Sequence, residues 1–176
     1  VKLNSVILVS NTAYEIGLIV RESQVEGLGV KATTDGFLSS HGVHFDISTP
    51  TLITVFADKN GNGTYDAAGG EMTQEYTINN NRSGSVLGMC TVASLTAQTS
   101  LYCTSNNSKQ TLDVVFTRPN PEALFKIRNI PTEIPGSYVG AVVINVGFEG
   151  DVCRSVVIEK TGAVEITKTH CTPMQQ

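Results

Sequence analysis

The chain has 176 residues, of which 40% are hydrophobic and 16% are charged, and its formal net charge is −4 at pH 7. This length fits one domain with a single core, and the composition excludes a disordered chain, which would have more charged and fewer apolar residues. The acidic balance gives no general attraction to nucleic acid or anionic lipid, although local basic patches remain compatible with it. The longest clear apolar run, residues 6–9, is too short to span a membrane.

The first thirty residues have the pattern of an amphipathic helix. Four apolar residues recur at spacings of four, three and four: Val9, Ala13, Ile16 and Val20. Charged residues lie mostly off this line, which is typical of a helix that buries one face. The pattern predicts a helix over about residues 5–26 that ends at Gly27 and Gly29. We expect the four apolar residues to pack on the rest of the protein.

After Gly36 the pattern changes to alternating residues with many β-branched side chains. It predicts eight strands, over residues 41–47, 51–57, 71–78, 111–117, 123–128, 141–147, 153–159 and 164–168. The weakly patterned, Ser/Thr-rich segment between the turns at 79–85 and 104–109 is interpreted as a surface excursion. One helix followed by about eight short strands predicts an α+β fold, in which the helix packs on antiparallel β-sheet.

The four cysteines, Cys90, Cys103, Cys153 and Cys171, include no CxxC pair, and no histidine is spaced to complete a zinc site. This spacing favours disulfides and an oxidising compartment over the alternative of four free thiols in a cytosolic protein. Three connectivities are possible. We favour Cys90 with Cys103 and Cys153 with Cys171, because this pairing makes two local loops, and a hairpin turning at Gly162 would bring the second pair together.

The stretch from Asp58 to Asp66 resembles a calcium-binding loop. Positions 1, 3, 5, 7 and 9 of that pattern are filled by Asp58, Asn60, Asn62, Thr64 and Asp66. Gly63 stands at position 6, but position 12, normally a glutamate, is Gly69, and Glu71 comes two residues later. The alternative is a hairpin turn that needs Asn and Gly for their backbone conformations alone. Both interpretations remain open from sequence.

Other candidate sites have less support. His41 and His44 would face opposite sides of a strand, and no third metal ligand is indicated. A small basic patch would comprise Thr117, Arg118, Lys126 and Arg128. Three glycosylation sequons occur, at Asn62, Asn81 and Asn106. No Ser/His/Asp arrangement stands out, so we expect neither enzymatic activity nor a small-molecule substrate.

Several segments, taken in order, resemble a known family. They are residues 11–30 (NTAYEIGLIVRESQVEGLGV), 42–45 (GVHF), 56–63 (FADKNGNG), 115–121 (VFTRPNP), 154–158 (RSVVI) and 162–164 (GAV). Together they resemble the type IV pilin-like proteins, especially the minor pseudopilin H type of type II secretion systems and its type IV pilus relatives. No single motif is specific, but the order covers most of the chain.

The resemblance implies a structural subunit, a minor pilin or pseudopilin, whose partners are other such subunits. Residues 1–29 would be the C-terminal half of the family's long helix and residues 30–176 its β-rich head. The family's processing site and apolar half-helix, which anchor a methylated precursor in the inner membrane, do not occur here, and we expect that they were removed. The protein would then act at the bacterial cell surface or in the periplasm.

Two other functions stay open from sequence. One is a surface adhesin or a DNA-uptake pilin, in which basic residues or the Cys90–Cys103 segment would contact a ligand. DNA-uptake pilins hold DNA with a basic C-terminal segment, whereas residues 169–176 contain no arginine, so nucleic-acid binding is not expected. An extracellular hydrolase is the third and weakest candidate, because no catalytic set converges in the sequence.

Overall fold

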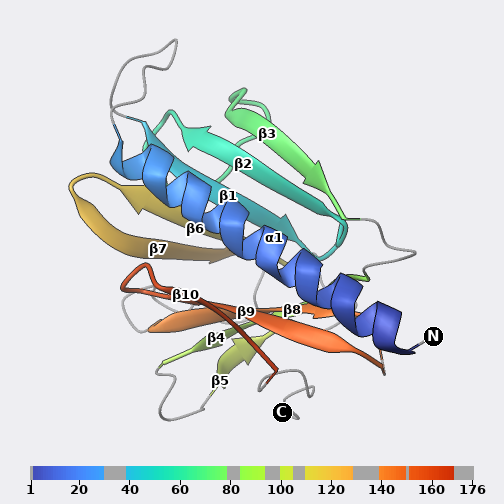
Figure 1. Cartoon of the computed structure of the whole chain (residues 1–176). Helices are drawn as coiled ribbons and strands as arrows, with labels where there is room; N and C mark the ends of the chain where they lie inside the picture. The colour runs from blue at the N-terminus through green and yellow to red at the C-terminus, as the bar shows by residue number, and fades with distance from the viewer. Residues whose placement is uncertain are drawn as a thin grey trace.

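The computed structural model describes residues 2–29, 39–78, 84–93, 100–104, 110–128, 139–149 and 151–168. Within them, one helix precedes ten strands (Figure 1). The elements are α1 (Lys2–Leu28), β1 (Ser40–Asp46), β2 (Leu52–Asp58), β3 (Met72–Thr77), β4 (Ser85–Val92), β5 (Ser100–Cys103), β6 (Thr111–Thr117), β7 (Asn120–Arg128), β8 (Ala141–Gly147), β9 (Cys153–Glu159) and β10 (Val164–Thr167).

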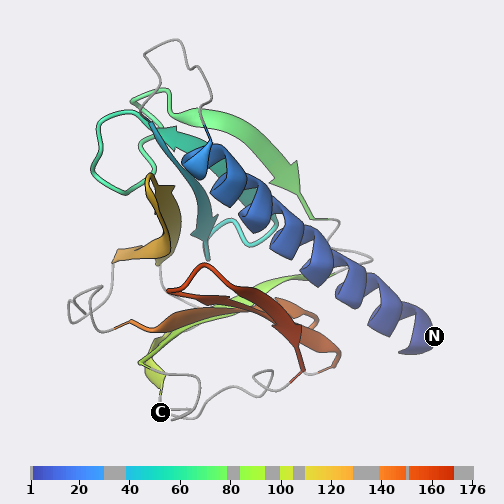
Figure 2. The same ribbon diagram turned by 60° about the vertical axis from the view of Figure 1, so that its left-hand side comes forward.

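The strands form two antiparallel sheets of five strands each. The first has the order β3-β2-β1-β6-β7 and the second has the order β10-β9-β8-β4-β5. Helix α1 runs across both sheets, as the two views in Figure 1 and Figure 2 show. The sheets are joined where Ala123 N on β7 donates to Lys160 O, 2.8 Å away, beside the β9–β10 turn.

One hydrophobic cluster lies between the helix and the inner faces of both sheets. It includes Ile16 and Val20 from α1, Phe45 and Phe116 from the first sheet, and Ile144 from the second, each of them 0–1% exposed. Alternate strand residues point into this cluster because successive side chains of a strand face opposite sides. The helix is therefore part of the core.

Gly27 allows the helix to approach β6 closely. A Cβ atom at this position would lie 2.5 Å from the carbonyl oxygen of Phe116, so any larger residue would push α1 off the sheet. The helix continues through Gly27 to Leu28, and Gly29 N donates to Val25 O at 2.8 Å. The prediction that Gly27 terminates the helix was wrong, because this glycine serves close packing.

The predicted α+β fold with about eight strands was also wrong. About half of the described residues are in strands and a fifth are in the helix, so the fold is mostly β, with two five-stranded sheets. The two strands that the sequence did not reveal are β4 and β5. Their segment was interpreted as a surface excursion, yet β4 pairs with both β8 and β5, and its Val86 and Met89 are buried in the core.

The two strands were missed because register shifts break their alternation. One lies between Val86 and Gly88 and another between Thr91 and Val92. A bulge inserts an extra residue into one strand, so the apolar period of two is lost at that point. A pattern search based on strict alternation cannot find such a strand.

Candidate functional site

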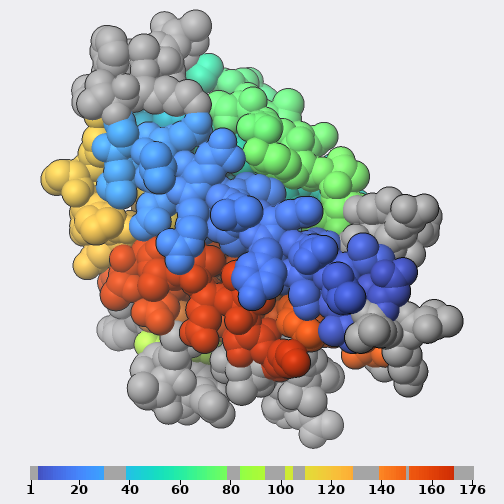
Figure 3. Space-filling model, viewed as in Figure 1, coloured from blue at the N-terminus to red at the C-terminus, as the bar shows by residue number. Residues whose placement is uncertain are grey.

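Helix α1 presents apolar residues on two opposite faces. The four residues predicted to pack inward are almost completely buried: Val9, Ala13, Ile16 and Val20 are 0%, 0%, 1% and 0% exposed. A second set is exposed: Ile7, Tyr14, Leu18 and Val25 are 51%, 58%, 65% and 69% exposed. We call these four residues the outer stripe. Figure 3 shows the helix, in blue, lying open across this face of the molecule.

The outer stripe lies about 150° around the helix from the buried line. At about 100° per residue, its four members fall within about 40° of one another on the helical wheel. Their spacing of seven, four and seven residues is visible in the sequence. The stripe was not predicted, because the helical pattern was interpreted only for the face that enters the core.

A groove of about 310 Å³ runs between α1 and β3. Its apolar lining includes Ile16, Ile53 and Ile78, and its rim carries the carboxylate of Glu22. Tyr76 Oη donates a hydrogen bond to Glu22 Oε2 at 3.4 Å. Burial, followed by the field of Glu22, raises the pKa of Tyr76 above its ordinary value. The groove is therefore apolar at its base and acidic at its edge.

The loop from β2 to β3 contains the predicted calcium ligands, and Asp58 is its central acceptor. Its Oδ1 accepts hydrogen bonds from Gly61 N at 2.8 Å and Asn62 N at 3.2 Å, and its Oδ2 accepts one from Gly63 N at 2.9 Å. Asp58 is only 4% exposed. Gly61 and Gly63 have φ values of 73° and 74°, a conformation that glycine adopts without strain. This carboxylate thus organises a turn.

The other predicted ligands also bind the backbone of the loop. Asn60 Oδ1 accepts from Asn62 N, Asn62 Oδ1 accepts from Thr64 N, and Asp66 Oδ1 accepts from Ala68 N. Glu71, 1% exposed, accepts from Lys59 N and Asp66 N. In the part of the chain that the structure describes, no three His, Cys, Asp or Glu side chains are arranged to hold a metal ion. These contacts give the acidic and amide side chains a role in the turn, and the calcium site stays a prediction.

A polar cluster beneath this loop was not predicted. Asp113, completely buried, places Oδ1 2.6 Å from His44 Nδ1 and Oδ2 3.2 Å from Arg128 Nη2. Tyr65, from the loop, donates its N–H to Asp113 and accepts from Arg128 through its carbonyl oxygen. Its ring lies 5.0 Å from that of His44. The cluster therefore fixes the loop to the outer face of the first sheet.

The contacts of this cluster bear on the predicted histidine site and on the predicted basic patch. His44 is paired with Asp113, whereas His41 is buried and its Nδ1 lies 3.2 Å from Ser39 O. The structure thus does not bring the two histidines together in one site. The guanidinium of Arg128 is partly neutralised, which reduces the basic patch. The signal that could have revealed the cluster was Asp113 itself, a charged residue within the apolar strand 111–117.

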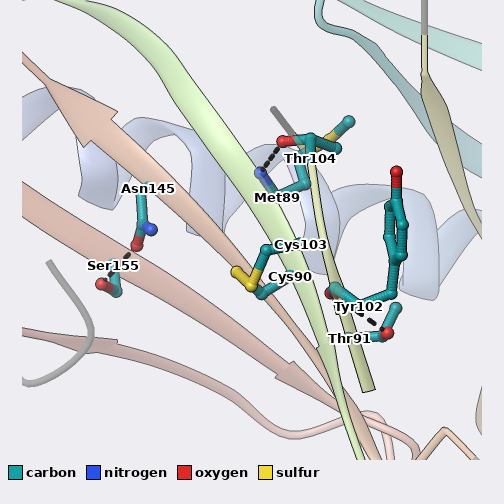
Figure 4. The surroundings of a disulfide bond; sticks show 8 residues. All are labelled: Met89, Cys90, Thr91, Tyr102, Cys103, Thr104, Asn145 and Ser155. Carbon is teal, nitrogen blue, oxygen red and sulfur yellow. Dashed lines mark hydrogen bonds between the residues drawn. A yellow bond between two sulfur atoms is a disulfide. The ribbon is translucent and has the colours of Figure 1, made fainter. Parts of the chain in front are cut away.

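Cys90 and Cys103 form a disulfide between directly paired residues of β4 and β5 (Figure 4). Nearby, Thr104 Oγ1 accepts a hydrogen bond from Met89 N at 2.8 Å. Cys171 lies outside the described residues, as do Asn81, Asn106 and the segment 169–176, so the second predicted disulfide stays a prediction. The β9–β10 ladder pairs Ile158 with Val164, which centres the hairpin one residue before the expected Gly162.

We expect reduction of the Cys90–Cys103 bridge to destabilise the protein by about 3 kcal/mol, because the bridge restricts the unfolded chain. The Cys90→Ser/Cys103→Ser variant should show the same loss in denaturant unfolding, and Thr91→Ser is a neighbouring control. Non-reducing peptide mapping should recover the two cysteines in one linked pair. Recovery of either cysteine in a bridge to Cys153 or Cys171 would contradict this connectivity.

No protein-family model, curated protein or solved structure matches the chain. Within the described residues, no helix combines the length and apolarity that crossing a membrane requires.

Proposed function

We propose that this chain is a structural subunit of a type IV pilus or of a type II secretion pseudopilus. The observation that carries the proposal is the two-sided helix α1. One face of the helix belongs to the core of the head, and the outer stripe of Ile7, Tyr14, Leu18 and Val25 remains accessible to a partner. The partners would be other pilin or pseudopilin subunits.

The energetics favour a covered outer stripe. Burying one large apolar side chain is worth about 1.5–3 kcal/mol, so four exposed ones along one helix represent a substantial driving force for association. Contiguous exposed apolar patches with a polar rim mark interaction surfaces. Here the charged residues Arg21 and Glu22 lie on either side of the stripe. A helix that served only the core would need no such stripe.

The disulfide supports the cellular location. Cys90–Cys103 joins neighbouring strands, and structural disulfides persist in oxidising compartments. This agrees with action at the bacterial cell surface or in the periplasm. DNA uptake has weaker support, because Arg128 of the basic patch is paired with Asp113.

The test is the presence of the chain in filaments. In the bacterium that carries the gene, an antibody against this chain should label sheared surface filaments or an overproduced pseudopilus. A Tyr14→Asp/Leu18→Asp variant should fold normally, since both side chains are exposed, but should be lost from filaments. The control is Glu15→Gln, a substitution on the exposed surface of the helix. A Val9→Ala/Asp66→Asn variant would not serve as a control, because it alters the core and the loop. The proposal would be contradicted if cells that lack the chain still form filaments and secrete normally.

A further inference from the structure

The two outer edges of the first sheet each carry one exposed large hydrophobic side chain. Outside α1, the described residues expose only two such side chains, Met72 on β3 at 53% and Leu124 on β7 at 44%. Strand β3 stands at one end of the order β3-β2-β1-β6-β7 and β7 stands at the other. Figure 3 shows them, green and yellow, on opposite sides of the helix. Apolar residues at both edges of one sheet suggest a contact between copies.

Each hydrophobic residue has a charged neighbour, and the two charges are opposite. Thr54 and Phe56 are two residues apart on β2, so their side chains share a face of the sheet. Their partners on β3 are Glu75 and Met72, and a register shift between these pairs adds one residue to β3. Met72 and Glu75 therefore also share that face, one repeat apart. Leu124 and Lys126 are likewise one repeat apart on one face of β7. One edge thus presents an apolar residue and an acid, and the other an apolar residue and a base.

Both pairs lie on the same face of the sheet, which is the face covered by the β2–β3 loop. The ring of Phe56, the partner of Met72, is 5.6 Å from that of Tyr65 in the loop. A Cβ atom at Gly63 in the loop would lie 3.0 Å from Leu124 and 3.3 Å from Lys126. A second copy in the same orientation would therefore present Leu124 and Lys126 on the face that carries Met72 and Glu75.

The strand directions also agree. Every neighbouring pair in the sheet is antiparallel, so the first and fifth strands, β3 and β7, run in the same direction. A translated copy would place β7 parallel to β3. In that arrangement Met72 meets Leu124 and Glu75 meets Lys126, in matching order along the two strands.

In the part of the chain that the structure describes, both edge strands have backbone that is paired with a neighbouring strand on one side only. Among the described residues β3 pairs with β2 alone, and it contains no proline or lysine, the residues that commonly protect an edge strand. The start of β7 is occupied, because Ala123 N donates to Lys160 O, but the stretch from Leu124 to Arg128 pairs only with β6 within the described chain. No ion pair to Glu75 or Lys126 is formed in the described part of the structure.

We infer that β3 of one copy adds to the second half of β7 of the next copy, so that the first sheet continues from subunit to subunit. This inference rests on the proposed function, since it names a contact between neighbouring subunits. The contact is heterologous and does not close on itself, which is the kind that generates open filaments. Backbone hydrogen bonds supply affinity, as in other strand additions, and the Met72–Leu124 and Glu75–Lys126 pairs fix the register.

A carbodiimide cross-link tests the contact, because this reagent joins a carboxylate to an amine that already touches it. Equal amounts of ¹⁴N- and ¹⁵N-labelled chain are mixed at about 1 mM, where a contact with a Kd near that value is about half formed. We expect a Glu75–Lys126 linkage that contains one peptide of each label. Glu75→Gln should abolish the linkage, and Glu15→Gln, on the helix, should leave it unchanged.

Charge exchange provides the second arm. Glu75→Lys and Lys126→Glu should each weaken self-association at least about tenfold in sedimentation velocity, because like charges meet. The variant with both substitutions should recover it, since each copy then offers the exchanged pair. A missing mixed-label linkage, or single variants that associate like wild type, would overturn the contact even if the chain is found in filaments. Absence from filaments would overturn the proposed function by itself, whatever the cross-link shows.

Discussion

Ile16→Asp should unfold the protein or leave it barely stable. Ile16 is 1% exposed and lies in the cluster shared by the helix and both sheets. The substitution removes a large apolar side chain and buries a charge without a partner, which together cost at least about 4 kcal/mol. Native domains are stable by only about 5–15 kcal/mol, so a domain at the lower end of that range would lose most of its stability. Thermal unfolding followed by circular dichroism should show a fall in Tm of at least about 8–16 °C.

Leu18→Asp is the matched control, because it introduces the same charge on the opposite face of the same helix. Leu18 is 65% exposed, so its replacement should change the free energy of unfolding by no more than about 0.5 kcal/mol. If Ile16→Asp melts like Leu18→Asp, the helix does not belong to the core. The two-sided character of α1, and with it the support for a filament subunit, would then fail.

The helix could be predicted from sequence because its signal is local. The spacing of Val9, Ala13, Ile16 and Val20 depends on the helical period alone, and all four are buried in the structure. The helix boundary was less accurate, since the role of Gly27 depends on the position of Phe116 in β6, far away in the sequence. A local pattern cannot reveal a contact between the helix and a distant strand.

Strand pairing was predictable only where the alternation was unbroken. Strands β6, β8 and β9 have the predicted boundaries, whereas β4 is interrupted by a shift near Gly88 and was missed. That omission made two five-stranded sheets look like one helix on about eight strands. The polar cluster was missed for a related reason: His44, Asp113 and Arg128 come from three strands, and only the sheet order β1-β6-β7 brings them together.

The loop between β2 and β3 illustrates how one pattern supports two interpretations. Alternating Asp and Asn residues suit calcium, but the same side chains suit a turn, because each can accept hydrogen bonds from nearby backbone N–H groups. Sequence alone cannot distinguish the two. In the structure, Asp58 accepts three such bonds and Glu71 accepts two. Hydrogen bonds within the loop therefore account for these two acidic residues.

Asp58→Ala should consequently destabilise the protein whether or not calcium is present. The substitution leaves three backbone N–H groups without their acceptor, and Gly63 N is in a buried hydrogen bond. Hydrogen bonds to a charged acceptor are worth about 1.5–3 kcal/mol, so we expect a loss of about 2–3 kcal/mol from the group as a whole. Asp58→Asn, which retains one acceptor oxygen, should lose less.

Thermal unfolding should be measured in a chelator and again with calcium in large excess. Asn60→Ala is the control, because Asn60 is exposed and accepts only one loop hydrogen bond, from Asn62 N. If the turn interpretation is right, Asp58→Ala lowers Tm equally in both conditions, and wild type melts at the same temperature in each. A ligand that binds only the folded state raises Tm. A calcium-dependent rise in wild type that Asp58→Ala abolishes would instead show that the carboxylate both orders the turn and binds the ion.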